Sequence, residues 1–245
     1  MTTAAAPPAM HTTRVQLPKS MKPLAIIDDD SLKEIATQCN SILRERAKKL
    51  SPTLWEDYRG NELMKRALVV AAISGQNLLL LGPRDAAPEN GVLLADQIGA
   101  NAFVVHTPSR EDMRTVHGDR AFEKWRKSRA VQRVSRLCPM MVEVPPRNAR
   151  DLLGKYKGTS LQQAGEQLQR GRKNLPQVVV PAACDLEEGA RTLLNQAINE
   201  LFGFTERLVA EAIITASAIA ALDQSTSIQM IHVAEAIQYR NLVTL

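Results

Sequence analysis

The sequence predicts an α/β fold in which a truncated parallel sheet is followed by an all-α C-terminal subdomain. Residues 77–83, Asn-Leu-Leu-Leu-Leu-Gly-Pro, form an apolar run that is typical of a central strand buried on both faces. Two further apolar runs, 102–108 and 138–146, end in proline and are expected to be strands as well. Residues 187–242 are rich in Ala, Leu and Ile, and they divide into three helices joined by short links.

Length and composition fit one compact domain with a small added subdomain. The chain has 245 residues, of which 44% are hydrophobic and 4% are aromatic, so an aliphatic core is expected. The formal charge of +5 permits binding to nucleic acid or to an acidic partner, but it establishes neither.

The cysteines and the apolar runs indicate a cytoplasmic protein. Cys39, Cys138 and Cys184 form no Cys-x-x-Cys pair, which argues against a zinc site or a disulfide framework. A reducing compartment is the simplest interpretation. The longest apolar run, near residues 69–81, is interrupted by polar residues and is too short to cross a bilayer. The N-terminus lacks the basic and apolar regions of a secretory signal.

Four regions are expected along the chain. Residues 1–23 are rich in Pro, Thr and Ala and predict a mobile arm. Residues 24–150 are expected to form the α/β core and residues 151–188 a polar linker that is helical in part. Residues 189–245 are expected to form a helical lid.

Two helices are predicted before the first strand. Ser31 and Glu34 have the spacing of a capping box at the start of an amphipathic helix. Residues 61–74 predict a second helix, which Gly75 ends. Residues 91–99, Gly-Val-Leu-Leu-Ala-Asp-Gln-Ile-Gly, fit either a short helix or a strand.

Three stretches carry a resemblance to a known family. Residues 57–83 contain Lys-Arg-Ala-Leu and then Asn-Leu-Leu-Leu-Leu-Gly-Pro, and residues 142–160 begin Val-Glu-Val-Pro. Residues 193–240 end in His-Val-Ala-Glu-Ala-Ile-Gln-Tyr-Arg. In this order the stretches resemble the magnesium-chelatase group of AAA+ ATPases, and within it the ComM/YifB competence-protein branch. The resemblance implies a truncated AAA+-like sheet with a helical lid.

The middle of the chain departs from this family. Its P-loop, Gly-Pro-Pro-Gly-x-Gly-Lys-Thr, holds phosphates and Mg²⁺ with successive N–H groups, the Lys and the Thr. Here Asp85 and Ala87 stand at the later glycines, Pro88 at the Lys and Glu89 at the Thr. Alanine is disfavoured at positive φ, proline lacks the N–H and the charge, and the carboxylates repel a polyanion. We therefore expect no ordinary ATP binding, no other cofactor, and a protein that is not an enzyme.

The resemblance also marks vestigial nucleotide-site positions, namely Gly82, Pro83, Arg84, Asp96 and Arg207. Asp96 matches the Mg²⁺-organising Asp of a Walker B strand if residues 92–99 are a strand, and Gln97 then replaces the catalytic Glu. If the same residues are the helix after the P-loop, Asp96 is a solvated side chain. Arg207 stands at the sensor arginine of the family, and its alternative interpretation is an exposed residue near a helix N-terminus.

A basic stretch at residues 119–136 lies outside the family motifs. Arg126, Arg129, Arg133 and Arg136 share one helical face, while Val134 and Leu137 are among the residues expected to pack. Such a face can neutralise phosphates without reading sequence, or it can simply be solvated. The candidate nucleic-acid contacts are Lys124, Arg126, Lys127, Arg129, Arg133 and Arg136.

Three functions follow from these patterns. The first is a catalytically degenerate, non-hydrolysing scaffold that binds other protein subunits, including an intact ATPase. The second is a DNA-binding accessory protein that uses residues 120–136. The third is a residual ATPase of the magnesium-chelatase or ComM type. The four histidines have no metal-ligand spacing, so no metal site is expected.

Overall fold

The computed structural model describes residues 55, 58–107, 128, 131, 134, 136–147, 153, 158–175, 184–200 and 206–240. The predictions for the N-terminal arm and for the helix that starts at Ser31 lie outside these residues. So do those for Lys124, Arg126, Lys127, Arg129 and Arg133.

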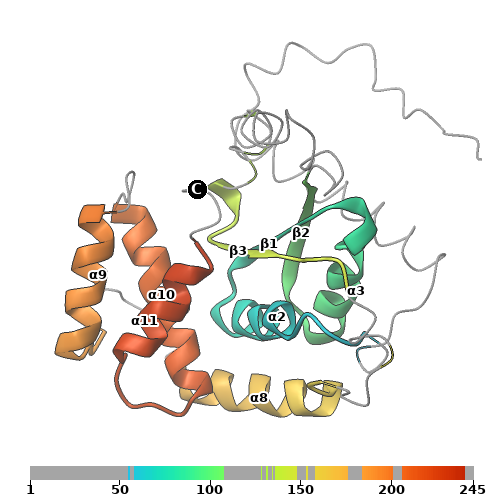
Figure 1. The fold of residues 1–245 in the computed structure, drawn as a ribbon. Coiled ribbons are helices and arrows are strands. Elements are labelled where there is room, and N and C mark those ends of the chain that lie inside the picture. Colours follow the sequence, from blue (N-terminus) through green and yellow to red (C-terminus); the bar gives the residue numbers. More distant parts are fainter. Residues whose placement is uncertain are drawn as a thin grey trace, which may run out of the picture.

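The centre of the fold is a parallel sheet of three strands in the order β2-β1-β3 (Figure 1). β1 (Asn77–Gly82) lies between β2 (Asn101–His106) and β3 (Met140–Glu143). Leu79 of β1 is in register with Phe103 of β2 and Met141 of β3. The predicted α/β class and its three parallel strands are therefore confirmed, with the most apolar run as the central strand.

The two faces of the sheet have different partners. Leu78 and Leu80 point to a large hydrophobic cluster that contains helices α2 (Glu62–Ser74) and α3 (Glu89–Ile98). Leu79 and Leu81 belong to a second cluster on the opposite face. This alternation follows from the two-residue period of a strand, and it explains why residues 78–81 of β1 are all leucine.

The ambiguous segment at residues 91–99 is helical. α3 covers it up to Ile98, and Gly99 adopts a left-handed φ of 70° at the C-cap. Residues 91–95 are buried, whereas Asp96 is exposed. The interpretation of this segment as a Walker B strand is therefore wrong, because its apolar residues pack at helical rather than alternating spacing.

In the part of the chain after β3 that the structure describes, the helices with defined bounds are α8 (Leu161–Asn174), α9 (Glu188–Glu200), α10 (Glu206–Leu222) and α11 (Met230–Gln238). Figure 1 shows α9, α10 and α11 side by side at one end of the sheet, with α8 alongside α2. The last three confirm the predicted C-terminal helices. The domain limits at residues 23, 150 and 188 stay predictions.

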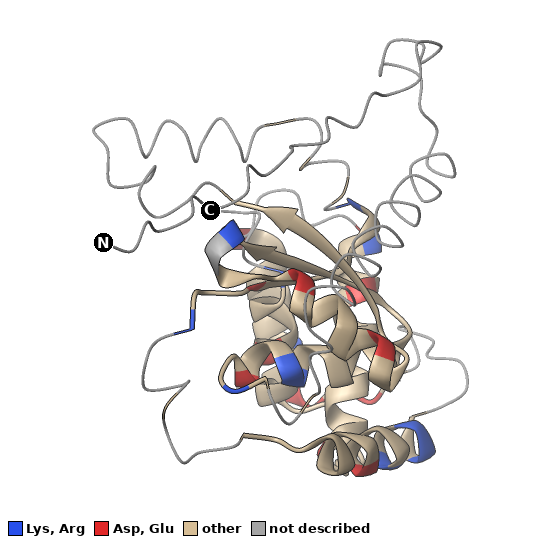
Figure 2. Ribbon diagram, turned by 90° about the vertical axis from the view of Figure 1, so that its right-hand side faces the viewer, with Lys and Arg blue, Asp and Glu red and all other residues tan. Residues whose placement is uncertain are grey.

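α8 illustrates how local sequence sets a helix. Ser160 Oγ accepts the N–H of Gln163 at 3.1 Å, and Gln163 Oε1 accepts the N–H of Ser160 at 2.9 Å, which is a capping box. At the other end, Arg172 and Lys173 complement the helix dipole. Figure 2 shows these basic residues gathered at one end of the helix, while acidic and basic residues are interspersed elsewhere on the ribbon.

The sheet and the C-terminal helices share one hydrophobic core. The large cluster contains Leu68 of α2, Leu80 of β1 and Ile219 of α10, all fully buried. α10 also packs against α8 and α2. This continuous packing fixes the C-terminal helices relative to the sheet.

Among the described residues, no helix combines the length and the apolar character that a membrane crossing requires.

Candidate functional site

The candidate site is the loop between β1 and α3, which we call the β1–α3 loop (residues 83–88). It leaves β1 at Gly82, passes through the 3-10 turn η2 (Arg84–Ala86) and enters α3 after Pro88. The strand order reverses at β1, and ligands of open α/β sheets bind beside such a point, outside the carboxyl ends of the strands. The strand–loop–helix geometry expected of a P-loop ancestor is therefore present.

Ala87 adopts the left-handed conformation that the sequence argument reserved for glycine. Its φ is 48° and its ψ is 55°. The expectation that alanine disfavours this conformation is overruled here by the surrounding turn, in which Ala87 N–H donates to Arg84 O at 3.1 Å. A non-glycine residue in this region costs about 1–2 kcal/mol, so the packing around the loop must offset that strain.

Two N–H groups of the β1–α3 loop are engaged within the loop. Ala86 N–H donates to Pro83 O at 3.0 Å, in addition to the Ala87 bond, and Pro83 and Pro88 have no N–H. A phosphate-binding loop instead turns successive N–H groups towards its ligand. In this loop, the bonds of Ala86 and Ala87 keep two N–H donors from that arrangement.

A carboxylate of the chain itself lies at the start of α3. Glu89 is the first residue of α3, and its Oε1 lies 2.9 Å from Nε2 of His106 at the end of β2. Both side chains are partly buried. A negative charge in the first turn of a helix is favourable, so Glu89 occupies the kind of position in which a helix N-terminus binds an anion.

The surroundings of Glu89 favour its charged form. Burial raises the pKa of Glu89, but the hydrogen bond with His106, the Glu89 backbone N–H and the charge of Arg84 lower it by more. The net pKa is below the ordinary value. The sequence placed Glu89 at the threonine position but missed its partner. The available signal was that His106 lies near the end of a run predicted to be a strand.

Gly82 has a packing role that is independent of any ligand. A Cβ at this position would lie 2.6 Å from the carbonyl oxygen of Val144. The close approach follows from the two bonds that hold β1 to its neighbours, Val144 N–H to Leu81 O at 2.7 Å and Thr107 N–H to Gly82 O at 3.0 Å. Pro83 is buried, and Arg84 is exposed beside the loop.

The structure does not bring Asp96 and Arg207 to the loop. Asp96 lies seven residues into α3, about 10 Å along the helix axis from Glu89. Arg207, in the first turn of α10, pairs with Glu211 at 2.8 Å and donates to the carbonyl oxygen of Arg136 at 3.0 Å. The guanidinium of Arg207 therefore connects α10 to the segment before β3.

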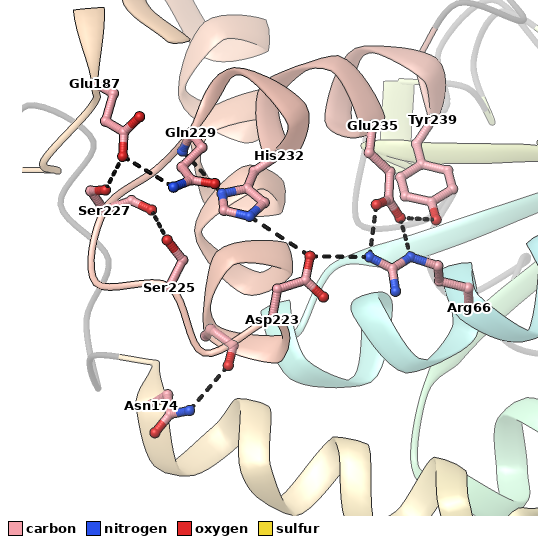
Figure 3. Close-up of polar contacts among 11 residues, drawn as sticks. Arg66, Asn174, Glu187, Asp223, Ser225, Ser227, Gln229, His232, Glu235 and Tyr239 are labelled. Carbon is pink, nitrogen blue, oxygen red and sulfur yellow. Dashed lines mark hydrogen bonds and ion pairs between the residues drawn. The ribbon is translucent and has the colours of Figure 1, made fainter. Parts of the chain in front are cut away.

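A polar contact that the sequence did not predict joins α11 to α2 (Figure 3). Arg66 of α2 forms a bidentate pair with Glu235 of α11, at 2.7 and 2.8 Å, and Tyr239 O–H donates to the same carboxylate at 2.7 Å. We call Arg66, Glu235 and Tyr239 the latch. Tyr239 O also accepts the N–H of Met141 at 2.6 Å, so α11 is tied to β3 as well.

The charges of the latch support one another. The bonds to Glu235 raise the pKa of Arg66. Burial raises the pKa of Glu235, but the bonds from Arg66 and Tyr239 lower it by more. Burial and the Glu235 carboxylate raise the pKa of Tyr239. The sequence offered a signal for this contact, because Arg66, Glu235 and Tyr239 all lie in the stretches that carry the family resemblance.

Two further contacts hold the C-terminal helices to the sheet. Arg240 pairs with Glu211 at 2.9 Å and donates to the carbonyl oxygen of Pro139 at 2.7 Å. Gln76 accepts from Thr215 Oγ1 at 2.6 Å and donates to the carbonyl oxygen of Glu211 at 3.0 Å.

A buried lysine joins the start of α2 to the start of the C-terminal region. Lys65 is 1% exposed, and its Nζ lies 3.3 Å from Glu62 Oε1. Glu62 Oε2 accepts both the N–H and the hydroxyl of Thr159, at 3.0 and 2.9 Å. Trp55 Nε1 donates to Thr159 O at 2.7 Å, and the φ of Gly158 is 69°. The family-like Lys65 therefore has a structural ion-pair role here.

The thiols and acidic groups provide no further candidate chemistry. Burial raises the pKa of the Cys138 thiol to about 12, against the opposing charge of Arg240, so this thiol stays protonated. Within the described part of the chain, no three His, Cys, Asp or Glu side chains are grouped as metal ligands.

Comparison with known proteins gives one finding. No curated protein matches the chain. Residues 159–240 match the family model described as magnesium chelatase, subunit ChlI C-terminal. The match begins at the Thr159 contact, spans α8 to α11 and ends at Arg240, and it covers about a third of the 245 residues. The C-terminal helical region is therefore similar to the C-terminal domain of the magnesium chelatase subunit ChlI.

Proposed function

We propose that the chain is a catalytically degenerate AAA+-like protein of the magnesium-chelatase and ComM type, acting as a non-hydrolysing scaffold for other protein subunits. The observation that carries this proposal is the pairing of Glu89 with His106 at the N-terminus of α3. A triphosphate at this position would meet a carboxylate instead of a lysine.

The engaged loop donors support the same proposal. Phosphate binding by this loop would require Ala86 and Ala87 to release their bonds to Pro83 and Arg84. It would also require the Glu89–His106 pair to open. Each change costs free energy. An intact P-loop has no such cost, because its backbone N–H donors already face the ligand.

The firm attachment of the C-terminal helices is the second support. The shared core and the latch hold α8 to α11 against the sheet through contacts between the chain's own residues. A protein whose parts are already fixed can present one constant surface to partners. Pull-down with the native chain, followed by identification of co-purifying subunits, is the direct search for such partners.

Titration calorimetry with ATP and Mg²⁺ tests the nucleotide part of the proposal. We expect no heat of binding for the native chain, and none for P88K or E89T, because each leaves most of the loop unchanged. The matched control is a variant in which residues 84–89 are replaced by Pro-Gly-Ser-Gly-Lys-Thr. Tight Mg²⁺-dependent binding by the native chain, or ATP turnover, would instead support a residual ATPase.

A second candidate function, DNA binding by residues 120–136, is favoured by one packing relationship. Val134 and Leu137 pack against the second hydrophobic cluster on the sheet, whereas Arg136 is exposed. An apolar side on the sheet leaves the other side of this stretch for solvent or phosphates. The candidate contacts remain Lys124, Arg126, Lys127, Arg129, Arg133 and Arg136.

A mobility-shift assay at low salt tests this second candidate. Charge reversal at Arg126, Arg129 and Arg133 is expected to abolish binding and its salt dependence. The matched control reverses the exposed Arg170, Lys173 and Arg191 instead, which changes the net charge equally. Equal losses in both variants, or no shift with the native chain, would count against a specific basic surface.

A further inference from the structure

His232 holds the first turn of α11 through an unprotonated ring nitrogen. It is the third residue of α11 and is 2% exposed. Its Nδ1 accepts the backbone N–H of Gln229, the N-cap residue, at 3.0 Å. A nitrogen that accepts an N–H carries no proton, so this contact assigns His232 the neutral form with its proton on Nε2. This is the role that Glu or Gln plays in a capping box.

Charged groups face His232 from four elements. Asp223, which follows α10, lies 3.7 Å from Nε2, and Glu235 stands one turn along α11. Glu187, before α9, accepts from Ser227 Oγ at 2.6 Å and from Gln229 Nε2 at 3.2 Å. Arg66 approaches from α2. The side chain is thus enclosed among three carboxylates and one guanidinium.

Protonation would change the bond to Gln229 directly. A proton on Nδ1 would face the N–H of Gln229, so two donors would oppose each other where a hydrogen bond now stands. The ring cannot simply turn outward, because it is almost fully buried. The imidazolium would gain attraction to Asp223, but the 3.7 Å separation exceeds a hydrogen bond.

We propose that His232 is a proton-sensitive cap of α11, and that its protonation loosens this helix and, through the latch, the attachment of the C-terminal helices to α2. α11 supplies Glu235 to the bidentate pair with Arg66, one turn after His232. Tyr239, just beyond its end, ties it to β3. Fraying of the first turn therefore reaches the residues that hold the helix in place.

The sign of the pH effect follows from the neutral folded form. Burial lowers the pKa of His232. The carboxylates of Asp223, Glu235 and Glu187 raise this pKa, and the charge of Arg66 lowers it. The net pKa is below the ordinary value. The unfolded chain then binds this proton more readily than the folded one. The stability contributed by His232 is full above the ordinary pKa of about 6.5, and it falls as pH drops from there through the folded pKa.

Hydrogen exchange of native chain and variants at pH 7.5 and 5.5 tests the proposal. After correction for intrinsic exchange rates, protection of residues 228–240 should fall several-fold more than that of α2 in the native chain. In H232Q, which keeps a capping acceptor without titrating, this differential loss should vanish. H232L, which lacks the acceptor, should be poorly protected at both pH values. Equal differential losses in the native chain and H232Q would overturn the proposal.

Nitrogen-15 NMR of the histidine rings keeps the test independent of variant folding. In the native chain at pH 7.5, His232 should show an unprotonated Nδ1 and a protonated Nε2. It should gain its second proton below the pH at which an unfolded histidine does. A protonated Nδ1 at pH 7.5, or titration of His232 without any change in the α11 amide signals, would overturn the proposal.

Discussion

The carboxylate of Glu89 in α3 lies 2.9 Å from Nε2 of His106 at the end of β2. The pair spans the carboxyl edge of the sheet, beside the strand at which the sheet order reverses. The chain therefore provides its own anion at the helix N-terminus, and a second chain segment provides the partner. This relationship gives the first prediction.

Replacement of Glu89 by Gln should destabilise the protein by about 1 kcal/mol at pH 7, because a charged hydrogen bond becomes a neutral one. The folded pKa of Glu89 is lowered, so its contribution is full above the unfolded pKa of about 4.3 and is lost as pH falls through the folded pKa. Urea unfolding at pH 7 and pH 4 measures both effects.

The matched control is E188Q, at an exposed first-turn position of α9. It shares the helix-dipole effect of Glu89 but not the contact with a histidine, so its change in stability should be smaller. Equal destabilisation by E89Q and E188Q would show that the His106 contact adds nothing to the effect of the helix N-terminus.

The latch should show measurable coupling between Arg66 and Glu235. In a double-mutant cycle of R66M, E235Q and their combination, we expect a coupling energy of about 1 kcal/mol, since the pair is bidentate but Arg66 is 38% exposed. R66K should recover little of this energy, because an ammonium cannot form two parallel bonds. Thermal unfolding at pH 7 measures all variants, and additive single effects would contradict the coupling.

Gly82→Ala should destabilise the protein by about 1–3 kcal/mol, because the new Cβ would meet the backbone oxygen of Val144. Gly165→Ala is the control within α8, where an added Cβ meets no atom within 4 Å. It should stabilise by about 0.5–1 kcal/mol through helix propensity. Both changes in stability are measured from the shift of the denaturant midpoint, provided that the slope is unchanged. A G82A variant as stable as the native protein would contradict the packing explanation for this glycine.

Cys138 should resist thiol reagents in the folded protein. It is fully buried, and its raised pKa of about 12 leaves almost no thiolate at pH 8. Cys184, which is only partly buried, should be modified first. Labelling at pH 8 with site mapping by mass spectrometry measures both rates. The rate at which Cys138 is labelled should match the rate of global unfolding. Faster labelling would indicate local opening around β3.

The sequence was informative wherever a property is local. The unbroken leucines of β1 predicted a central strand, because both of its faces are covered. Ala and Leu spacing predicted α9, α10 and α11. Residues 91–99 stayed ambiguous because a short apolar run fits a buried helix and a buried strand equally. Packing of α3 between α2 and β2 decided it.

The site was predicted less completely. The lack of a cationic side chain and of a backbone N–H at position 88 could be read from Pro88 alone, since no tertiary contact can supply what a proline lacks. The left-handed conformation of Ala87 could not be read from the sequence. The surrounding turn overrules a local conformational preference of about 1–2 kcal/mol. Asp96 and Arg207 were grouped with the loop by resemblance, but the structure places them elsewhere.

The sequence by itself determined the chemical inventory of the β1–α3 loop and the order of strands and helices. Tertiary structure alone decided which distant groups meet. His106 reaches Glu89 because parallel strands end at one edge of the sheet, and Arg66 reaches Glu235 across 169 residues because α2 and α11 pack on one core. Periodicity reports which face of an element is buried. The partner across that face depends on the packing of the whole chain.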